Sequence, residues 1–272
     1  MRPPGGPGPR VRALALAGAL ALPLIGAGCG DTRDGTALFE EGKRAVRDRR
    51  AIQALQLLRA AWEQGPEQPE LLAHLADVFQ RERWIAEGRE HFAGLLAARP
   101  DDPEIQFYLA FFEGRMGDVD RAETLFRTVL AARPHWWRAY LEYGDLLLRA
   151  GRMQEASHLL ARGLDVAPRN ARLAEKLAEA LCRGGTYDQA QALLGRFLAE
   201  RPEDRDLRAR LAFCHFDRGD LETAAAESRA LLAAHPDDLD ALYLLARIAM
   251  RRQDLAEAER LWQEVRRIEL AR

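Results

Sequence analysis

Large apolar, small and polar residues alternate along this chain with a fixed period of 34 residues. With a frame that starts at Gly35, the residues at position 20 of the seven copies are Ala54, Gly88, Ala122, Ala156, Ala190, Ala224 and Ala258. The residues at position 8 are Gly42, Ala76, Ala110, Gly144, Ala178, Ala212 and Ala246. Only small residues fit where two antiparallel helices cross at close range. The pattern therefore predicts one pair of crossing helices in each copy.

Each copy also carries residues that end helices and form turns. Proline occupies position 32 of six copies, at Pro66, Pro100, Pro134, Pro168, Pro202 and Pro236, and is expected to stop the second helix. Glycine occupies position 15 of the four middle copies, at Gly117, Gly151, Gly185 and Gly219, where a left-handed conformation can end the first helix. Asp118, Asp220 and Asp254 follow at position 16 and are expected to cap the second helix. A period of this length predicts an array of helix–turn–helix repeats.

The two ends of the array are more polar than its middle. Position 7 is apolar or tyrosine in copies two to seven but is Glu41 in the first, and position 10 is Arg44 in the first. Position 28 is apolar in six copies but is Arg266 in the last. Because the end surfaces of a solenoid have no neighbouring repeat, they must be polar to stay soluble. We therefore expect seven complete repeats.

The repeat resembles the tetratricopeptide repeat, whose pattern has Leu-Gly at positions 7 and 8, Ala at 20, an aromatic at 24 and Pro at 32. The copy that matches best contains Tyr140, Tyr143, Gly144, Leu147, Ala156, Leu160 and Pro168. The family's Trp at position 4 is missing from all copies, and Leu270 replaces the last Pro. The resemblance covers 35–272 and implies an all-α, right-handed α-solenoid of seven helix-turn-helix repeats. Their bounds are 35–68, 69–102, 103–136, 137–170, 171–204, 205–238 and 239–272.

The first 28 residues differ in kind from the repeats and are typical of a secretory signal. Arg2, Arg10 and Arg12 precede an uncharged stretch from Ala13 to Gly28, which is too short for a membrane-spanning helix. Residues 25–29 resemble a bacterial lipobox, although its usual leucine is a glycine here. We therefore predict lipidation of Cys29, with 29–34 as a short tether. One alternative is ordinary secretion, which would leave Cys29 with a free thiol. Another is a cytoplasmic protein whose start codon has been placed too far upstream.

The two remaining cysteines lie in neighbouring repeats. Cys214 is at position 10 and Cys182 at position 12 of the repeat before it. We interpret them as small buried apolar residues. A disulfide is the alternative, since neighbouring first helices could bring them close in an oxidising compartment, although disulfide geometry is demanding.

The sequence offers no recognisable catalytic or metal-binding motif. Ser157, Ser228 and Asn170 are the only serines and asparagine after residue 28, and the six histidines fall at six different repeat positions. No histidine pair has metal-ligand spacing, and no glycine-rich phosphate loop is present. The formal net charge of −2, with both signs mixed, does not favour nucleic acid. We therefore predict neither an enzyme nor a cofactor.

The resemblance implies a concave groove lined by the first helix of each repeat. The residues that we expect to bind a partner there are Phe107, Tyr108, Phe111, Leu141, Arg149, Phe213 and Tyr243. Aromatic residues outside the core often mark binding sites, although neighbouring helices could also cover them. The charged residues of repeats four and five are interpreted as a solvated face. Family members that bind chaperones use Lys at position 5 with Asn at 9, and no repeat here has that pair.

Together these features predict a monomeric, lipid-anchored scaffold in the cell envelope, on the outer membrane and facing the periplasm. Its partners are expected to be proteins that place an extended or helical segment in the groove. By analogy of architecture, the process is type IV pilus secretin assembly or exopolysaccharide export. A periplasmic adaptor that docks a cell-wall enzyme is the alternative, and a cytoplasmic regulatory adaptor is a weaker one.

Overall fold

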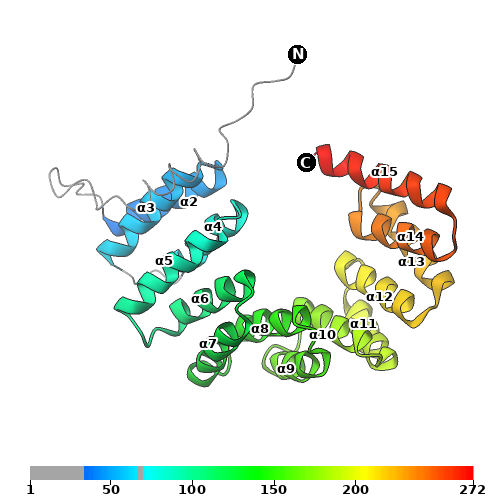
Figure 1. Cartoon of the computed structure of the whole chain (residues 1–272), viewed down its shortest axis with the longest axis horizontal. Coiled ribbons are helices and arrows are strands. Elements are labelled where there is room, and N and C mark those ends of the chain that lie inside the picture. The colour runs from blue at the N-terminus through cyan, green and yellow to red at the C-terminus, as the bar shows by residue number, and fades with distance from the viewer. Residues whose placement is uncertain (1–33, 66–69, 272) are drawn as a thin grey trace, which may run out of the picture. The chain divides into compact units, whose positions relative to one another are not determined.

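The computed structural model describes residues 34–65 and 70–271, which form fourteen helices and, within these ranges, no strand (Figure 1). The predicted signal, Cys29 and nearly all of the tether lie outside the described residues. The first helices of the seven repeats are α2 (Gly35–Arg47), α4 (Leu71–Arg81), α6 (Pro103–Met116), α8 (Trp137–Arg149), α10 (Ala171–Arg183), α12 (Arg205–Arg218) and α14 (Leu239–Arg251). The second helices are α3 (Ala51–Gln64), α5 (Ile85–Ala98), α7 (Val119–Ala132), α9 (Met153–Val166), α11 (Tyr187–Glu200), α13 (Leu221–Ala234) and α15 (Leu255–Ala271).

The helices fall into two compact units, with the boundary between Leu125 and Phe126 inside α7. In unit 1, α2 packs on α3 and α4 on α5, and the first helices α2, α4 and α6 contact one another in that order. In unit 2, each helix from α8 to α15 packs on the next along the chain, and α8, α10, α12 and α14 contact one another in that order. Contacts confined to sequence neighbours are those of a stacked repeat array. The predicted all-α repeat solenoid is confirmed.

The small residues lie where the helices approach most closely. A Cβ atom added to Gly144 would lie 2.5 Å from a methyl carbon of Leu160, its partner at position 24. At Gly88, it would lie 2.5 Å from the ring of Phe112 in the next repeat. Ala156 at position 20 is completely buried. Any larger side chain at these places would push helices apart, which explains the restriction seen in the sequence.

The turn between the two helices of a repeat has the predicted conformation. Gly117, Gly151, Gly185 and Gly219 have φ angles of 92°, 78°, 81° and 92°. Asp118, Asp220 and Asp254 each accept a hydrogen bond, 3.1 Å long, from the backbone N–H three residues later. These caps satisfy one of the free N–H groups at the start of the second helix. The first helices are capped in the same way by Asp102, Asn170, Asp204 and Asp238 at position 34.

Candidate functional site

The first helices of unit 2 form a continuous surface on which positions 6, 9 and 13 of neighbouring repeats meet. We call the surface formed by these positions of α8, α10, α12 and α14 the groove face. Its clearest contact joins Lys176 at position 6 of α10 to Asp145 at position 9 of α8, across 2.9 Å. The same pairing of positions recurs one repeat later between Arg210 and Glu179. The repeat frame therefore places side chains of adjacent helices side by side.

The predicted aromatic cluster of α6 is largely buried. Phe107 and Tyr108 are 3% and 5% exposed, and only Phe111 remains half-buried. The ring of Tyr108 lies 5.3 Å from that of Phe92, and Phe107 lies 5.0 Å from Tyr108, so both rings extend the core. The expectation that Phe107 and Tyr108 lie exposed on the groove is wrong, since the large ring of Phe92 brings position 6 into the core. Their part in partner binding stays a prediction.

The other predicted binding residues are divided between core and surface. Leu141 is buried, whereas Phe213 and Tyr243 are half-buried. The hydroxyl of Tyr243 donates to Glu269 of α15 across 2.9 Å, which raises the pKa of the tyrosine. Arg149 is exposed and pairs with Asp145 one turn earlier. The structure thus brings Arg149 and Phe213 onto the groove face but holds Leu141 beneath it.

A network of ion pairs connects three helices across the groove face. Lys176 bridges Asp145 of α8 and Glu179 of its own helix, at 2.9 and 3.2 Å. Arg210 of α12 reaches both Glu175 and Glu179 of α10, at 3.1 and 3.2 Å. These side chains are only 17–29% exposed, so they do not form the solvated face that the sequence suggested. Half-buried charges that share partners between helices fix the spacing of those helices.

The network also shifts the acidity of its members. Burial by itself favours the neutral form of Asp145, but hydrogen bonds and charge from Lys176 and Arg149 outweigh it and lower the pKa of the carboxyl. Burial likewise opposes the charge of Lys176, whose pKa is nevertheless raised by Asp145 and Glu179. Both groups are therefore ionised near neutral pH.

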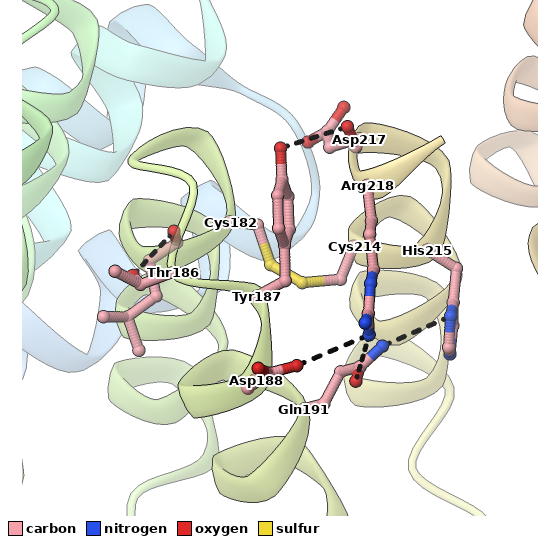
Figure 2. Close-up of a disulfide and its surroundings, with 10 residues drawn as sticks. Cys182, Thr186, Tyr187, Asp188, Gln191, Cys214, His215, Asp217 and Arg218 are labelled. Atoms are coloured by element: carbon pink, nitrogen blue, oxygen red, sulfur yellow. Dashed lines mark hydrogen bonds and ion pairs between the residues drawn. A yellow bond between two sulfur atoms is a disulfide. The ribbon is translucent and has the colours of Figure 1, made fainter. Parts of the chain in front are cut away.

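A disulfide joins α10 to α12 beside this network (Figure 2). Cys182 and Cys214 have Cα atoms 5.5 Å apart, within the range that a disulfide spans. Our interpretation of these cysteines as unbonded apolar residues is wrong, because adjacent first helices bring position 12 of one repeat against position 10 of the next. Figure 2 also shows Tyr187 donating to the backbone oxygen of Asp217, and Arg218 pairing with Asp188. These contacts hold α11 against α12 around the disulfide.

The disulfide forms part of a pocket of about 310 Å³ between α10, α12 and α14. Its lining comprises Glu179, Cys182, Arg183, Arg210, Phe213, Cys214, Asp217 and Arg247. Desolvation by the surrounding helices raises the pKa of Asp217, although Arg247, Arg210, Arg251 and Arg183 oppose the shift. The pocket therefore combines apolar atoms with several guanidinium groups.

Arginine recurs at position 13 of six repeats, which the sequence reading had missed. The series is Arg47, Arg81, Arg115, Arg149, Arg183 and Arg251, and Asp217 takes the place in repeat six. Position 13 lies at the end of a first helix, where a cation interacts favourably with the helix dipole. Arg81, Arg149 and Arg183 each pair with a carboxylate at position 9 of their own helix. Aligning the seven copies column by column would have revealed the series.

A second pocket, of about 330 Å³, lies in unit 1 between α3 and α5. His91 of α5 lines it and packs between the rings of Phe79 and Phe92, each with its centre 5.5 Å away. Its Nε2 atom is buried and has no hydrogen-bond partner among the residues that the structure describes. Burial, assisted by the charge of Arg59, lowers the pKa of His91 to about 4, so the ring is neutral near pH 7.

The described residues contain no group of three or more His, Cys, Asp or Glu side chains that could hold a metal ion. No helix in the described part of the chain has the length and apolar character needed to cross a bilayer.

The model of the tetratricopeptide repeat family matches residues 115–180, 183–227 and 215–269, which is more than half of the chain. The chain belongs to the tetratricopeptide repeat family. Tetratricopeptide repeats are scaffolds for protein–protein interaction and generally not enzymes. Among curated proteins there is no significant match.

Several solved tetratricopeptide structures share the fold. A repeat protein from Parabacteroides merdae is 19% identical, with a TM-score of 0.70 over 86% of this chain and 93% of that chain. The type IV pilus biogenesis factor PilW is 19% identical, with a TM-score of 0.65 over 78% of this chain and 98% of its own. PilF of Pseudomonas aeruginosa is also 19% identical, with a TM-score of 0.59 over 78% of this chain and 97% of its own. At this identity the likeness establishes the fold alone.

Proposed function

We propose that this chain is a lipid-anchored tetratricopeptide scaffold of a bacterial cell envelope, held on the outer membrane, which binds a partner protein on the groove face of unit 2. The observation that carries the proposal is the disulfide between Cys182 and Cys214, which lines a pocket of that face. Disulfides persist in oxidising compartments such as the bacterial periplasm and are rare in the cytosol. The secretory pattern of residues 1–28 supports the same location.

The process that we propose is assembly of the type IV pilus. Two proteins that share the fold, PilW and PilF, carry names that connect them with this machinery, and PilW is described as a pilus biogenesis factor. A scaffold anchored close to the membrane would suit a machine that must be assembled in the outer membrane.

The anchor is tested by replacing Cys29 with serine in the full chain. Metabolic labelling with a fatty acid should mark the wild-type protein and not Cys29→Ser, and membrane fractionation should then find the variant in the soluble fraction or unprocessed. Equal labelling and equal membrane retention of the two proteins would contradict lipidation.

The groove face is tested by site-specific photo-crosslinking in cells. A photoreactive amino acid at Arg149, which is exposed on α8, should capture a pilus component such as the secretin. The same substitution at Arg266, exposed on α15 away from the groove face, is the matched control. Capture of the same proteins from both positions, or of no pilus component from Arg149, would contradict the proposal.

A further inference from the structure

Within the described ranges, two guanidinium groups at the α14 end of the groove face have no carboxylate partner. Arg149, Lys176, Arg183 and Arg210 all form ion pairs with groove carboxylates. Arg247 and Arg251 form none within the described part of the chain; their guanidinium carbons lie 4.5 Å from the ring centre of Phe216. A guanidinium that stacks on a ring keeps its N–H donors available at its edge.

Phe216 holds these two cations in place. Its ring is 1% exposed and packs in the core of unit 2, with Ala212 and Leu245 among its cluster. Because the ring is fixed, Arg247 and Arg251 are positioned before any ligand arrives, which lowers the entropy lost on binding. Asp217 on the groove face interacts electrostatically with both arginines and also forms no ion pair within the described residues.

The charge of this part of the groove face is positive. In repeats five to seven, five cations and three carboxylates occupy positions 5, 6, 9 and 13. The cations are Lys176, Arg183, Arg210, Arg247 and Arg251, and the carboxylates are those of Glu175, Glu179 and Asp217. The opposite end of the same helices carries both signs, with Arg172, Asp206 and Asp240 at position 2, and Arg205 pairs there with Asp206. An anionic ligand is therefore attracted to the end that holds Arg247 and Arg251.

Apolar atoms lie beside these cations. Phe213, half-buried, lines the pocket between α10, α12 and α14. Met250 stands next to Arg251 in the chain and is 53% exposed, one of few large apolar residues on the surface. Flexible methionine side chains adapt to a partner's apolar groups. The combination fits a peptide that carries both carboxylates and aliphatic side chains, whereas an anionic polysaccharide has no aliphatic side chains to place there.

We propose that Arg247 and Arg251 bind a carboxylate of an acidic protein segment, whose neighbouring apolar side chain packs on Phe213 and Met250. This inference rests on the proposed function and names the chemistry of the partner. Asp217 opposes the ligand, because its carboxylate interacts with Arg247 and Arg251 and would repel a second carboxylate there.

The test is fluorescence anisotropy with a short fluorescein-labelled peptide that alternates glutamate with leucine, titrated with the full chain in detergent. Arg247→Gln and Arg251→Gln should each weaken binding about tenfold or more, as loss of one partner of a close charge pair does. Asp217→Asn should tighten binding several-fold, a gain that unfolding could not produce. Arg266→Gln makes the same change of charge on α15 and should leave the affinity unchanged.

Three results would overturn the inference. Equal binding of a peptide with glutamine in place of glutamate would show that carboxylates are not recognised. An equal loss of peptide affinity in Arg266→Gln would show an effect of overall charge. Displacement of the labelled peptide by alginate at a lower concentration than by unlabelled peptide would identify a polysaccharide ligand. Thermal melts of each variant establish that the fold is retained. If the Arg247→Gln/Arg251→Gln protein is still retained on the membrane and still crosslinks to the pilus component from position 149, the proposed function stands and only the partner chemistry inferred here fails.

Discussion

The hydroxyl group of Tyr140 donates a hydrogen bond to the carbonyl oxygen of Pro134 across 3.0 Å. It links position 4 of one first helix to the proline at position 32 of the repeat before it. Gln106 donates to Pro100 in the same way, and Arg208 to Pro202. Three chemically different side chains thus serve one purpose: they satisfy a carbonyl that follows the end of a second helix.

Removing this bond should lower stability without changing the fold. The ring of Tyr140 is 3% exposed but Pro134 is exposed, so the bond is part-buried and Tyr140→Phe removes the donor that the carbonyl of Pro134 has within the chain. We expect the free energy of unfolding to fall by about 1 kcal/mol. Urea denaturation measures it, with Tyr243→Phe as the control, because the bond from Tyr243 to Glu269 is exposed and should matter little. Equal midpoints for wild type and Tyr140→Phe would contradict this account.

The elements were predictable because each depends on residues close together in the sequence. Gly151 at position 15 and Asp118 at position 16 act within one turn, and Ala156 meets its partner helix within the same repeat. The repetition of such local signals over seven copies identified the fold before any long-range contact was considered.

The candidate site was less predictable because it depends on contacts between repeats. Whether Tyr108 is exposed depends on the size of Phe92, a residue of the preceding repeat. The disulfide depends on the distance between Cys182 and Cys214, and the ion network on which helix faces meet. A periodic pattern gives the position of a residue in its repeat but not the volume of its neighbours.

The conformation at position 15 gives a second prediction. Gln253 has φ of 62°, in the left-handed region where four other repeats have glycine. That conformation costs a residue with a side chain about 1–2 kcal/mol, partly offset by the greater backbone entropy that glycine loses on folding. Gln253→Gly should therefore raise the free energy of unfolding by about 0.5–1 kcal/mol, and Gly151→Gln should lower it. Thermal melts of both variants in parallel test the sign; a decrease for Gln253→Gly would refute the strain.

The disulfide should stabilise unit 2. Disulfides that close loops of this size, with Cys182 and Cys214 at a sequence separation of 32, typically contribute about 2–4 kcal/mol. Cys182→Ala/Cys214→Ala should lose that amount of unfolding free energy. A reducing agent should lower the melting temperature of the wild type and leave the double variant unaffected. A wild type that is insensitive to the reductant would argue that the cysteines are unbonded.

His91 should make unit 1 sensitive to acid. Its pKa is lowered to about 4 in the folded chain from 6.5, so below pH 6.5 the unfolded state binds the proton more readily and stability falls. The loss at pH 5 relative to pH 8 should be about 2 kcal/mol. His74, whose pKa burial also lowers, acts in the same direction. The measurement is therefore the loss of unfolding free energy between pH 8 and pH 5, compared between wild type and His91→Phe. If His91 titrates with its ordinary pKa in the folded chain, the two proteins should lose the same amount.

The aromatic residues of α6 allow core and binding roles to be separated. Phe112 is completely buried and Phe107 nearly so, and replacing either with alanine should cost about 3–5 kcal/mol of stability. Phe111 is half-buried, with its ring 5.2 Å from Phe112 and 5.1 Å from the guanidinium of Arg115. Phe111→Ala should cost less stability than either.

Phe111→Ala should also weaken binding of the partner, because an aromatic residue that remains partly accessible can contribute more than about 2 kcal/mol to an interface. Thermal melts and pull-downs from detergent extracts of Phe111→Ala and Phe112→Ala separate the two effects. If Phe111→Ala melts as early as Phe112→Ala, its ring belongs to the core. If it melts near the wild type and still recovers every partner, unit 1 does not contribute an aromatic contact and the binding surface lies with Phe213 in unit 2.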